Sequence, residues 1–125
     1  MTSEKFTLGK QERVRSKVDI DKIFAHGKSA SDGVLTVIVV PNGLPHSRVC
    51  VGASKKWGHA PRRNRLKRIM RTVFRLSKHD LPSALDYMMM PRIGVETMTL
   101  EAAQKSLITL ARRAAQRVNS SKSDH

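Results

Sequence analysis

The sequence predicts a single domain of the α/β (α+β) sandwich class, in which helices cover one small sheet. Three observations support this. The 125 residues suit one domain with one modest core. Hydrophobic spacing changes between helical and extended periods along the chain. No internal repeat divides the chain, so residues 1–125 are treated as one domain with an ordered core over about residues 6–117 and a polar, flexible tail over residues 119–125.

A short first helix is predicted after Ser16, because Ser16 and Asp19 resemble a capping box. Apolar residues follow at helical spacing, namely Ile20, Ile23 and Phe24. Gly27 is expected to end this helix.

Two strands are predicted next. The run Val34–Val40 is almost entirely β-branched and indicates a strand that is covered on both faces or nearly so. Proline and glycine at positions 41–45 break it, and residues 48–53 are expected to form the returning strand.

The clearest element is a helix over Pro61–Ser77, where Pro61 favours a helix start. Its apolar stripe consists of Leu66, Ile69, Met70, Val73 and Phe74. A strand over residues 85–92 follows. Thr99 is expected to cap a last helix whose buried side carries Leu100, Ala103, Leu107, Leu110, Ala111 and Ala114.

The charge of the chain points to a polyanionic partner. Lys and Arg number 24 against 10 Asp and Glu, which gives a formal net charge of +14. Residues 33–79 contain 11 cations and no acid. Like charges repel along a helix, and a phosphate backbone would compensate many of them at once.

Several other classes of function are disfavoured. The acidic residues are scattered, whereas two-metal phosphodiester hydrolysis needs clustered carboxylates. The longest apolar run, Val34–Val40, is far shorter than the ~20 residues that span a bilayer. A lone cysteine, Cys50, suits a reducing cytoplasm and reads as a core thiol.

The run Gly52–Arg71 closely resembles the signature of the bacterial ribonuclease P protein component. The matching features are Ser-Lys-Lys at a strand end, a Gly-x-Ala loop, and Arg-Asn-Arg at the start of a basic helix. Agreement extends to Arg13-Val14, to residues 19–27 and to Asp86-Tyr87, so that it covers roughly residues 6–117.

The resemblance implies the order αβββαβα with a left-handed βαβ crossover, and a division of labour. A catalytic RNA removes the 5′ leader of precursor tRNA with Mg²⁺ that the RNA itself holds. The protein binds no cofactor, helps to hold the leader, supports productive Mg²⁺ binding, and needs neither a membrane nor a protein partner. Such a protein is expected in the cytoplasm.

Two sets of site residues follow from the resemblance and from the charge pattern. Residues expected to contact the catalytic RNA are Lys55, Lys56, Arg62, Arg63, Asn64, Arg65, Lys67, Arg68 and Arg71. Residues expected in a leader-binding cleft are Arg13, Arg15, Ile20, Phe24, Ile38, Tyr87 and Arg92. Ile20 and Ile38 stand where many relatives carry aromatic residues, and aliphatic side chains stack less well on bases.

Two alternatives remain open at this point. A basic structural RNA-binding protein of ribosomal type would explain the charge equally well. A nuclease with its own active site would have to cleave RNA without an RNA partner.

Overall fold

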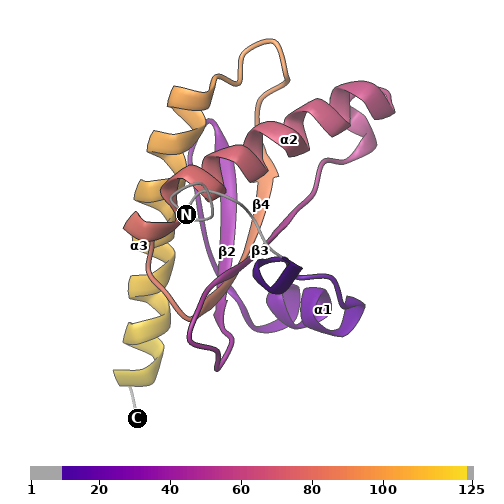
Figure 1. The fold of residues 1–125 in the computed structure, drawn as a ribbon. Coiled ribbons are helices and arrows are strands. Elements are labelled where there is room, and N and C mark those ends of the chain that lie inside the picture. The colour runs from indigo at the N-terminus through magenta and orange to yellow at the C-terminus, as the bar shows by residue number, and fades with distance from the viewer. Residues whose placement is uncertain (1–9, 124–125) are drawn as a thin grey trace, which may run out of the picture.

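The computed structural model describes residues 10–123, which form a four-stranded sheet with helices on both faces (Figure 1). The elements follow in the order α1 (Lys17–His26), β1 (Lys28–Ser31), β2 (Leu35–Pro41), β3 (Arg48–Val51), α2 (Ala60–Ser77), β4 (Leu85–Pro91) and α3 (Leu100–Ser123). Short 3-10 turns, η2 (Lys10–Glu12), η3 (Lys55–Trp57) and η4 (Lys78–Asp80), lie between them. This αβββαβα order is the one that the resemblance implies.

The sheet has the strand order β1-β2-β4-β3. β2 is antiparallel to both neighbours, β1 and β4, whereas β3 and β4 are parallel and are joined by α2. β3 is therefore an edge strand, and the chain before α1 partly covers its outer edge. There the N–H of Val14 donates to the carbonyl oxygen of Val49 at 2.9 Å.

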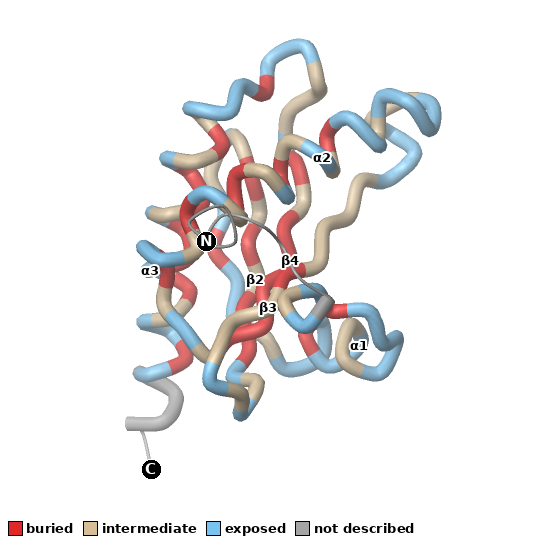
Figure 2. Tube along the Cα trace, viewed as in Figure 1, coloured by how far each residue is buried: buried red, intermediate tan, exposed pale blue. Residues whose placement is uncertain are grey.

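The two faces of the sheet carry separate apolar cores. α2 and α3 pack on one face over a large cluster that includes Leu35, Val37, Phe74 and Met89. α1 covers part of the other face, over a small cluster of Val14, Ile23, Val40 and Met88. Figure 2 shows the result, with the buried positions concentrated along β2, β4 and the inner side of α3.

The end of α1 lies directly against β2, which explains Gly27. A Cβ atom at this position would collide with the carbonyl oxygen of Ile23 and with a methyl group of Ile38. The backbone of Gly27 is extended, and its N–H donates to the carbonyl oxygen of Ile23. Gly27 therefore ends the helix as predicted, through close approach rather than through a left-handed conformation.

Four details of the predicted fold are corrected. β1 has no apolar pattern (Lys-Ser-Ala-Ser) and was not located from the residues alone. Ser16 makes no side-chain capping bond. Leu100 is 48% exposed because it lies at the first turn of α3, outside the buried stripe. The expected tail is helical through Ser123, because Val118 still anchors the last turns of α3.

The remaining elements follow the predictions. The Thr99 hydroxyl accepts the N–H of Ala102 at 3.1 Å and so caps α3. The expected core residues 6–9 lie outside the described residues. Within residues 10–123, no helix has the length and apolar composition required to cross a membrane.

Candidate nucleic-acid interface

The first half of α2 presents most of the predicted cations to solvent. Its apolar stripe, anchored by the fully buried Leu66 and Met70, fixes the rotation of the helix against the sheet. The side chains that remain exposed are Arg62, Asn64, Arg65, Arg68 and Arg71, whereas Arg63 and Lys67 are half-buried. The predicted basic face is thus present. It wraps around the helix rather than forming one plane.

Two arginines of this segment differ from their neighbours. Arg62 forms an ion pair with Glu96, a residue of the loop between β4 and α3, although both side chains are more than half exposed. Nε of Arg63 is buried and has no hydrogen-bond partner within the described residues. A buried donor without a partner is costly, which sets Arg63 apart from the solvated arginines of this surface.

The loop before α2 carries Lys55 and Lys56, and both are exposed as predicted. The ammonium group of Lys56 lies 4.9 Å from the centre of the Trp57 ring. Trp57 is half-buried and packs against the main core, so its ring anchors the loop to the fold. The two lysines extend the positive surface of α2 beyond its N-terminus.

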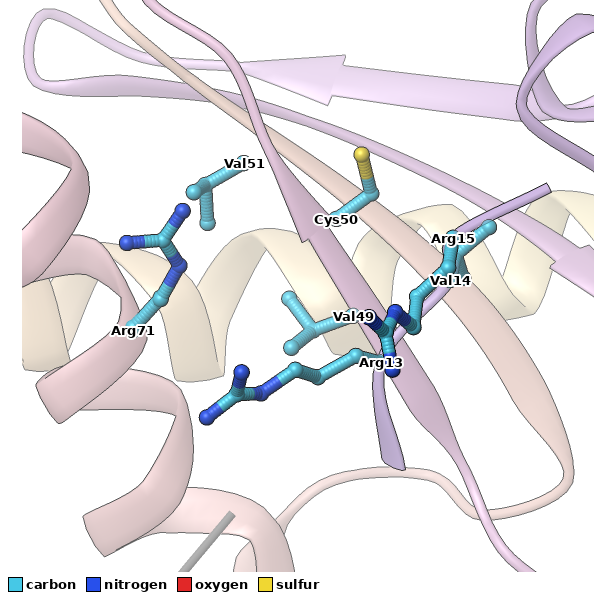
Figure 3. A pocket seen from close by; sticks show the side chains of 7 residues that line it. All are labelled: Arg13, Val14, Arg15, Val49, Cys50, Val51 and Arg71. Carbon is cyan, nitrogen blue, oxygen red and sulfur yellow. The ribbon is translucent and has the colours of Figure 1, made fainter. Parts of the chain in front are cut away.

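Three arginines from two distant parts of the sequence line an open hollow of about 170 Å³ between the N-terminal segment, β3 and α2. They are Arg13, Arg15 and Arg71, and the other lining residues are Val14, Val49, Cys50 and Val51. Figure 3 shows Arg13 and Arg71 reaching toward the gap between β3 and α2, one from the N-terminal segment and the other from the helix. Among residues 10–123, no acidic residue lines this arginine hollow, so it suits an anion.

Cys50 lines the arginine hollow and is half-buried, and its side chain packs against the small cluster on the α1 side. Burial raises its pKa, and the nearby charges of Arg71 and Lys67 only partly oppose that effect. The thiol therefore stays protonated near neutral pH. This agrees with the prediction of an unreactive thiol, although Cys50 lies at the margin of the core rather than inside it.

An apolar strip lies on the α1 side of the sheet. Ile20 on α1 and Ile38 on β2 are half-buried and pack against the same small cluster. Phe24, one turn after Ile20, is 53% exposed. Three of the expected leader-binding residues thus lie on one face of the molecule, and we call Ile20, Phe24 and Ile38 the α1 strip.

Tyr87 does not belong to this strip, contrary to the prediction. It is fully buried in the main core on the opposite face, with its ring 5.4 Å from that of Phe74. Its hydroxyl donates to the carbonyl oxygen of Pro82 at 2.5 Å, and burial raises the pKa of Tyr87 above its ordinary range. Successive strand residues alternate between faces, so Met88, not Tyr87, faces α1.

Arg92 lies just beyond the end of β4, where its N–H donates to the carbonyl oxygen of Val34. It follows Met88 and Met90, which pack on the α1 side of the sheet, at the alternate positions of the strand. Arg92 is four residues, or about 13 Å at roughly 3.3 Å per residue, from Met88. It is exposed, and its place in the leader-binding cleft stays a prediction.

A network of charged side chains, not anticipated from the sequence, holds α1 near the sheet. The buried carboxylate of Asp86 accepts Nε of Arg48 at 2.8 Å, Nη2 of Arg48 at 2.5 Å and Nδ2 of Asn42 at 3.0 Å. The same Nη2 lies 3.4 Å from Oδ2 of Asp19 on α1. An acid inside an otherwise apolar strand was the available signal, because a buried carboxylate requires partners.

No cluster of three or more His, Cys, Asp or Glu side chains within the described part of the chain could hold a metal ion. The arrangement therefore offers cationic and apolar surfaces for a polyanion, together with one anion-sized hollow between them.

Comparisons with known proteins agree with this arrangement. The family model described as Ribonuclease P matches residues 8–115. The ribonuclease P protein component of Thermotoga petrophila is 35% identical over 115 residues, which are 89% of this chain and 97% of that protein. The solved ribonuclease P protein of Thermotoga maritima superposes with a TM-score of 0.74 at 33% identity, covering 82% of this chain and 96% of that one. The Staphylococcus aureus protein gives 0.71 at 29% identity, with coverages of 82% and 94%.

Proposed function

The chain belongs to the ribonuclease P protein family, and we propose that it acts there as the RNA-binding subunit that assists a catalytic RNA in removing the 5′ leader of precursor tRNA. Family membership argues against the ribosomal alternative. We assign no catalytic side chain to the protein and leave the chemistry, with its Mg²⁺, to the RNA. We place the complex in the cytoplasm, which suits the unpaired Cys50.

The observation that carries this proposal is the arginine hollow. Arg71 belongs to the α2 surface that we assign to the catalytic RNA, whereas Arg13 and Arg15 lead into α1 and toward the leader. One hollow thus joins the two RNA-binding surfaces. Guanidinium groups bind phosphate oxygens through paired N–H donors, so RNA phosphates can occupy the place where the two surfaces meet.

The α1 strip suits a single strand rather than a duplex. Unpaired bases can spread onto apolar walls and rings, whereas the bases of a duplex stay stacked inside it. Phe24 supplies the exposed ring of the strip. Ile20 and Ile38 supply aliphatic walls, from which we expect weaker stacking than from aromatic side chains.

Reconstitution with a ribonuclease P RNA on precursor tRNA tests the proposal. The protein alone should not cleave, and it should accelerate the RNA-catalysed reaction at low Mg²⁺. Cleavage at the 5′ junction by RNA-free protein, abolished when its own carboxylates are replaced, would contradict the assignment.

A pair of exposed apolar residues on α1 tests the leader contact. Phe24→Ala should reduce the affinity difference between a long-leader substrate and one trimmed to a single leader nucleotide, by up to about 1–3 kcal/mol if a base stacks on the ring. Val18 is 75% exposed on the same helix, and Val18→Ala should leave the difference unchanged. If the Phe24 variant loses the same affinity for both substrates, Phe24 does not contact the leader.

A further inference from the structure

A second basic surface lies at the outer edge of β1, away from α2. Residues 22–31 and 102–119 contain no acid, and α3 brings these two stretches together. Lys28 opens β1, while Arg113 and Arg117 lie one turn apart on α3, and all three are exposed. We call these three residues the β1 edge surface.

Contacts of the two arginines fix their position along β1. Nη1 of Arg117 donates to the carbonyl oxygen of Ser29 at 2.7 Å. The Ser106 hydroxyl bonds Asp32 in the turn after β1, so Arg113 lies on α3 between this point and Arg117. Burial opposes ionisation of Asp32, but hydrogen bonds and the charge of Arg113 together lower its pKa. The oxygens of Asp32 are engaged by the backbone N–H groups of Val34 and Leu35 and by the Ser106 hydroxyl. The carboxylate is thus already bonded within the fold.

The β1 edge surface is continuous with the α1 strip. Ile38 pairs with Ser29 across the β1–β2 ladder, and both side chains lie on the α1 face. Ser31 and Thr36 lie on the same face, and their hydroxyls are 2.9 Å apart. Ser29 and Ser31 are exposed. Strands are about 4.8 Å apart, so a single strand spacing of about 5 Å, bearing exposed hydroxyl groups, separates Ile38 on β2 from the edge strand β1.

We propose that the β1 edge surface binds phosphates of the leader upstream of the nucleotides that lie on the α1 strip. The inference rests on the proposed function and extends the path of the same single strand. Hydroxyl groups along the path can bond sugar hydroxyls, and the cations at its end can bind phosphates. Figure 1 places the N-terminal half of α2 and the C-terminal half of α3 at opposite ends of the molecule. A catalytic RNA bound at α2 therefore leaves this edge available to the substrate.

Holoenzyme binding to precursor tRNA with three leaders tests the proposal: one trimmed to a single nucleotide, one that spans the α1 strip only, and one that extends further. In the Arg113→Gln/Arg117→Gln variant, the gain from the short leader should be retained. The further gain from the long leader should be lost. Losing two contacts to a single strand should lower the salt slope of long-leader binding by about 1.4, or about sevenfold in affinity between 50 and 200 mM salt.

A matched pair of single variants removes the same charge from two sides of α3. Arg112 is exposed and lies opposite the buried stripe, whereas its chain neighbour Arg113 lies on the β1 side. Arg112→Gln should retain the long-leader gain, and Arg113→Gln should lose part of it, with half the change in slope of the double variant. Because Arg117 bonds the backbone of β1, Arg113→Gln also serves as the second variant if the double variant is unstable.

Two results would overturn the inference. Either the long-leader gain persists in the Arg113→Gln/Arg117→Gln variant, or the Arg112→Gln control loses as much as Arg113→Gln. In both cases the proposed function is still supported if the short leader increases the affinity of the holoenzyme and this increase depends on Phe24. If the wild-type holoenzyme gains nothing from the short leader, the proposed leader contact and the β1 edge surface are both wrong.

Discussion

Replacing Arg48 by methionine should destabilise the fold by about 3–5 kcal/mol, because it leaves a buried carboxylate without its main partner. Asp86 is 4% exposed. Arg48 donates two hydrogen bonds to this carboxylate, at 2.8 and 2.5 Å, and Asn42 donates another at 3.0 Å. Methionine retains much of the side-chain length, so the loss reports the missing charge and donors more than a cavity.

The expected cost of the Arg48 replacement depends on how strongly its two acidic partners, Asp19 and Asp86, differ in exposure. Asp19 is 35% exposed at its side chain and lies 3.4 Å from Arg48, so Asp19→Asn should cost at most about 1 kcal/mol. The buried end, at Asp86, accounts for the rest of the Arg48 effect. For a chain of this size, a loss of 3–5 kcal/mol lowers Tm by roughly 10–20 °C.

Urea unfolding, followed by far-UV circular dichroism and by Trp57 fluorescence, measures these changes. Arg48→Met/Asp86→Leu removes both charges and should recover a large part of the loss, because an apolar pair can replace a buried ion pair. Two results would refute the reasoning: an Arg48→Met cost no larger than that of Asp19→Asn, or a double variant no more stable than Arg48→Met.

Three further predictions concern the basic surface, the hollow and the half-buried Asp32. Arg68→Ala should weaken binding to the catalytic RNA and lower the salt slope by about 0.9, whereas Arg112→Ala, with equal charge loss on α3, should change neither. The raised pKa of Cys50 predicts slow alkylation by iodoacetamide at neutral pH, faster reaction as pH rises past the range of a free cysteine, and protection by bound RNA; rapid, RNA-insensitive labelling would contradict this. The pKa of Asp32 is lower in the folded state than in the unfolded state. The ionised carboxylate therefore stabilises the fold at pH values above its unfolded-state pKa, and this stabilisation is lost as the pH falls through its folded-state pKa. Ser106→Ala should therefore move this acid-induced loss to higher pH, as measured by urea unfolding over a pH series.

The helices were predictable because their apolar spacing is strong and local. The stripe of α2 requires one face to be buried, and Leu66, Met70, Val73 and Phe74 are buried as expected. β1 was not predictable from the residues, because its four residues contain a single buried side chain, Ala30. Pairing with β2 and the cover of α3 define this strand, and both are tertiary effects that a four-residue polar pattern does not encode.

The parts of the candidate site that depend on charge were predictable from the sequence. The parts that depend on which face of the sheet α1 covers were not. An acid-free basic helix indicates its own surface, and the α2 cations are exposed accordingly. For β4, alternation requires that Tyr87 share a face with Leu85 and Met89, and that Asp86 share the other with Met88. Which face α1 covers depends on where the helices pack, so the sequence left Tyr87 on the wrong side.

The arginine hollow depends on a short segment before α1 that the fold holds in place. η2 and the residues after it are attached at separate points: Glu12 pairs with Lys78 at 2.8 Å, His46 bonds the carbonyl oxygen of Gln11 at 2.8 Å, and Val14 bonds Val49. Binding costs less when the contacting groups are already ordered. The protein therefore presents Arg13 beside Arg71 before any RNA arrives, and the surface that we assign to the catalytic RNA meets the proposed path of the leader at a preformed point.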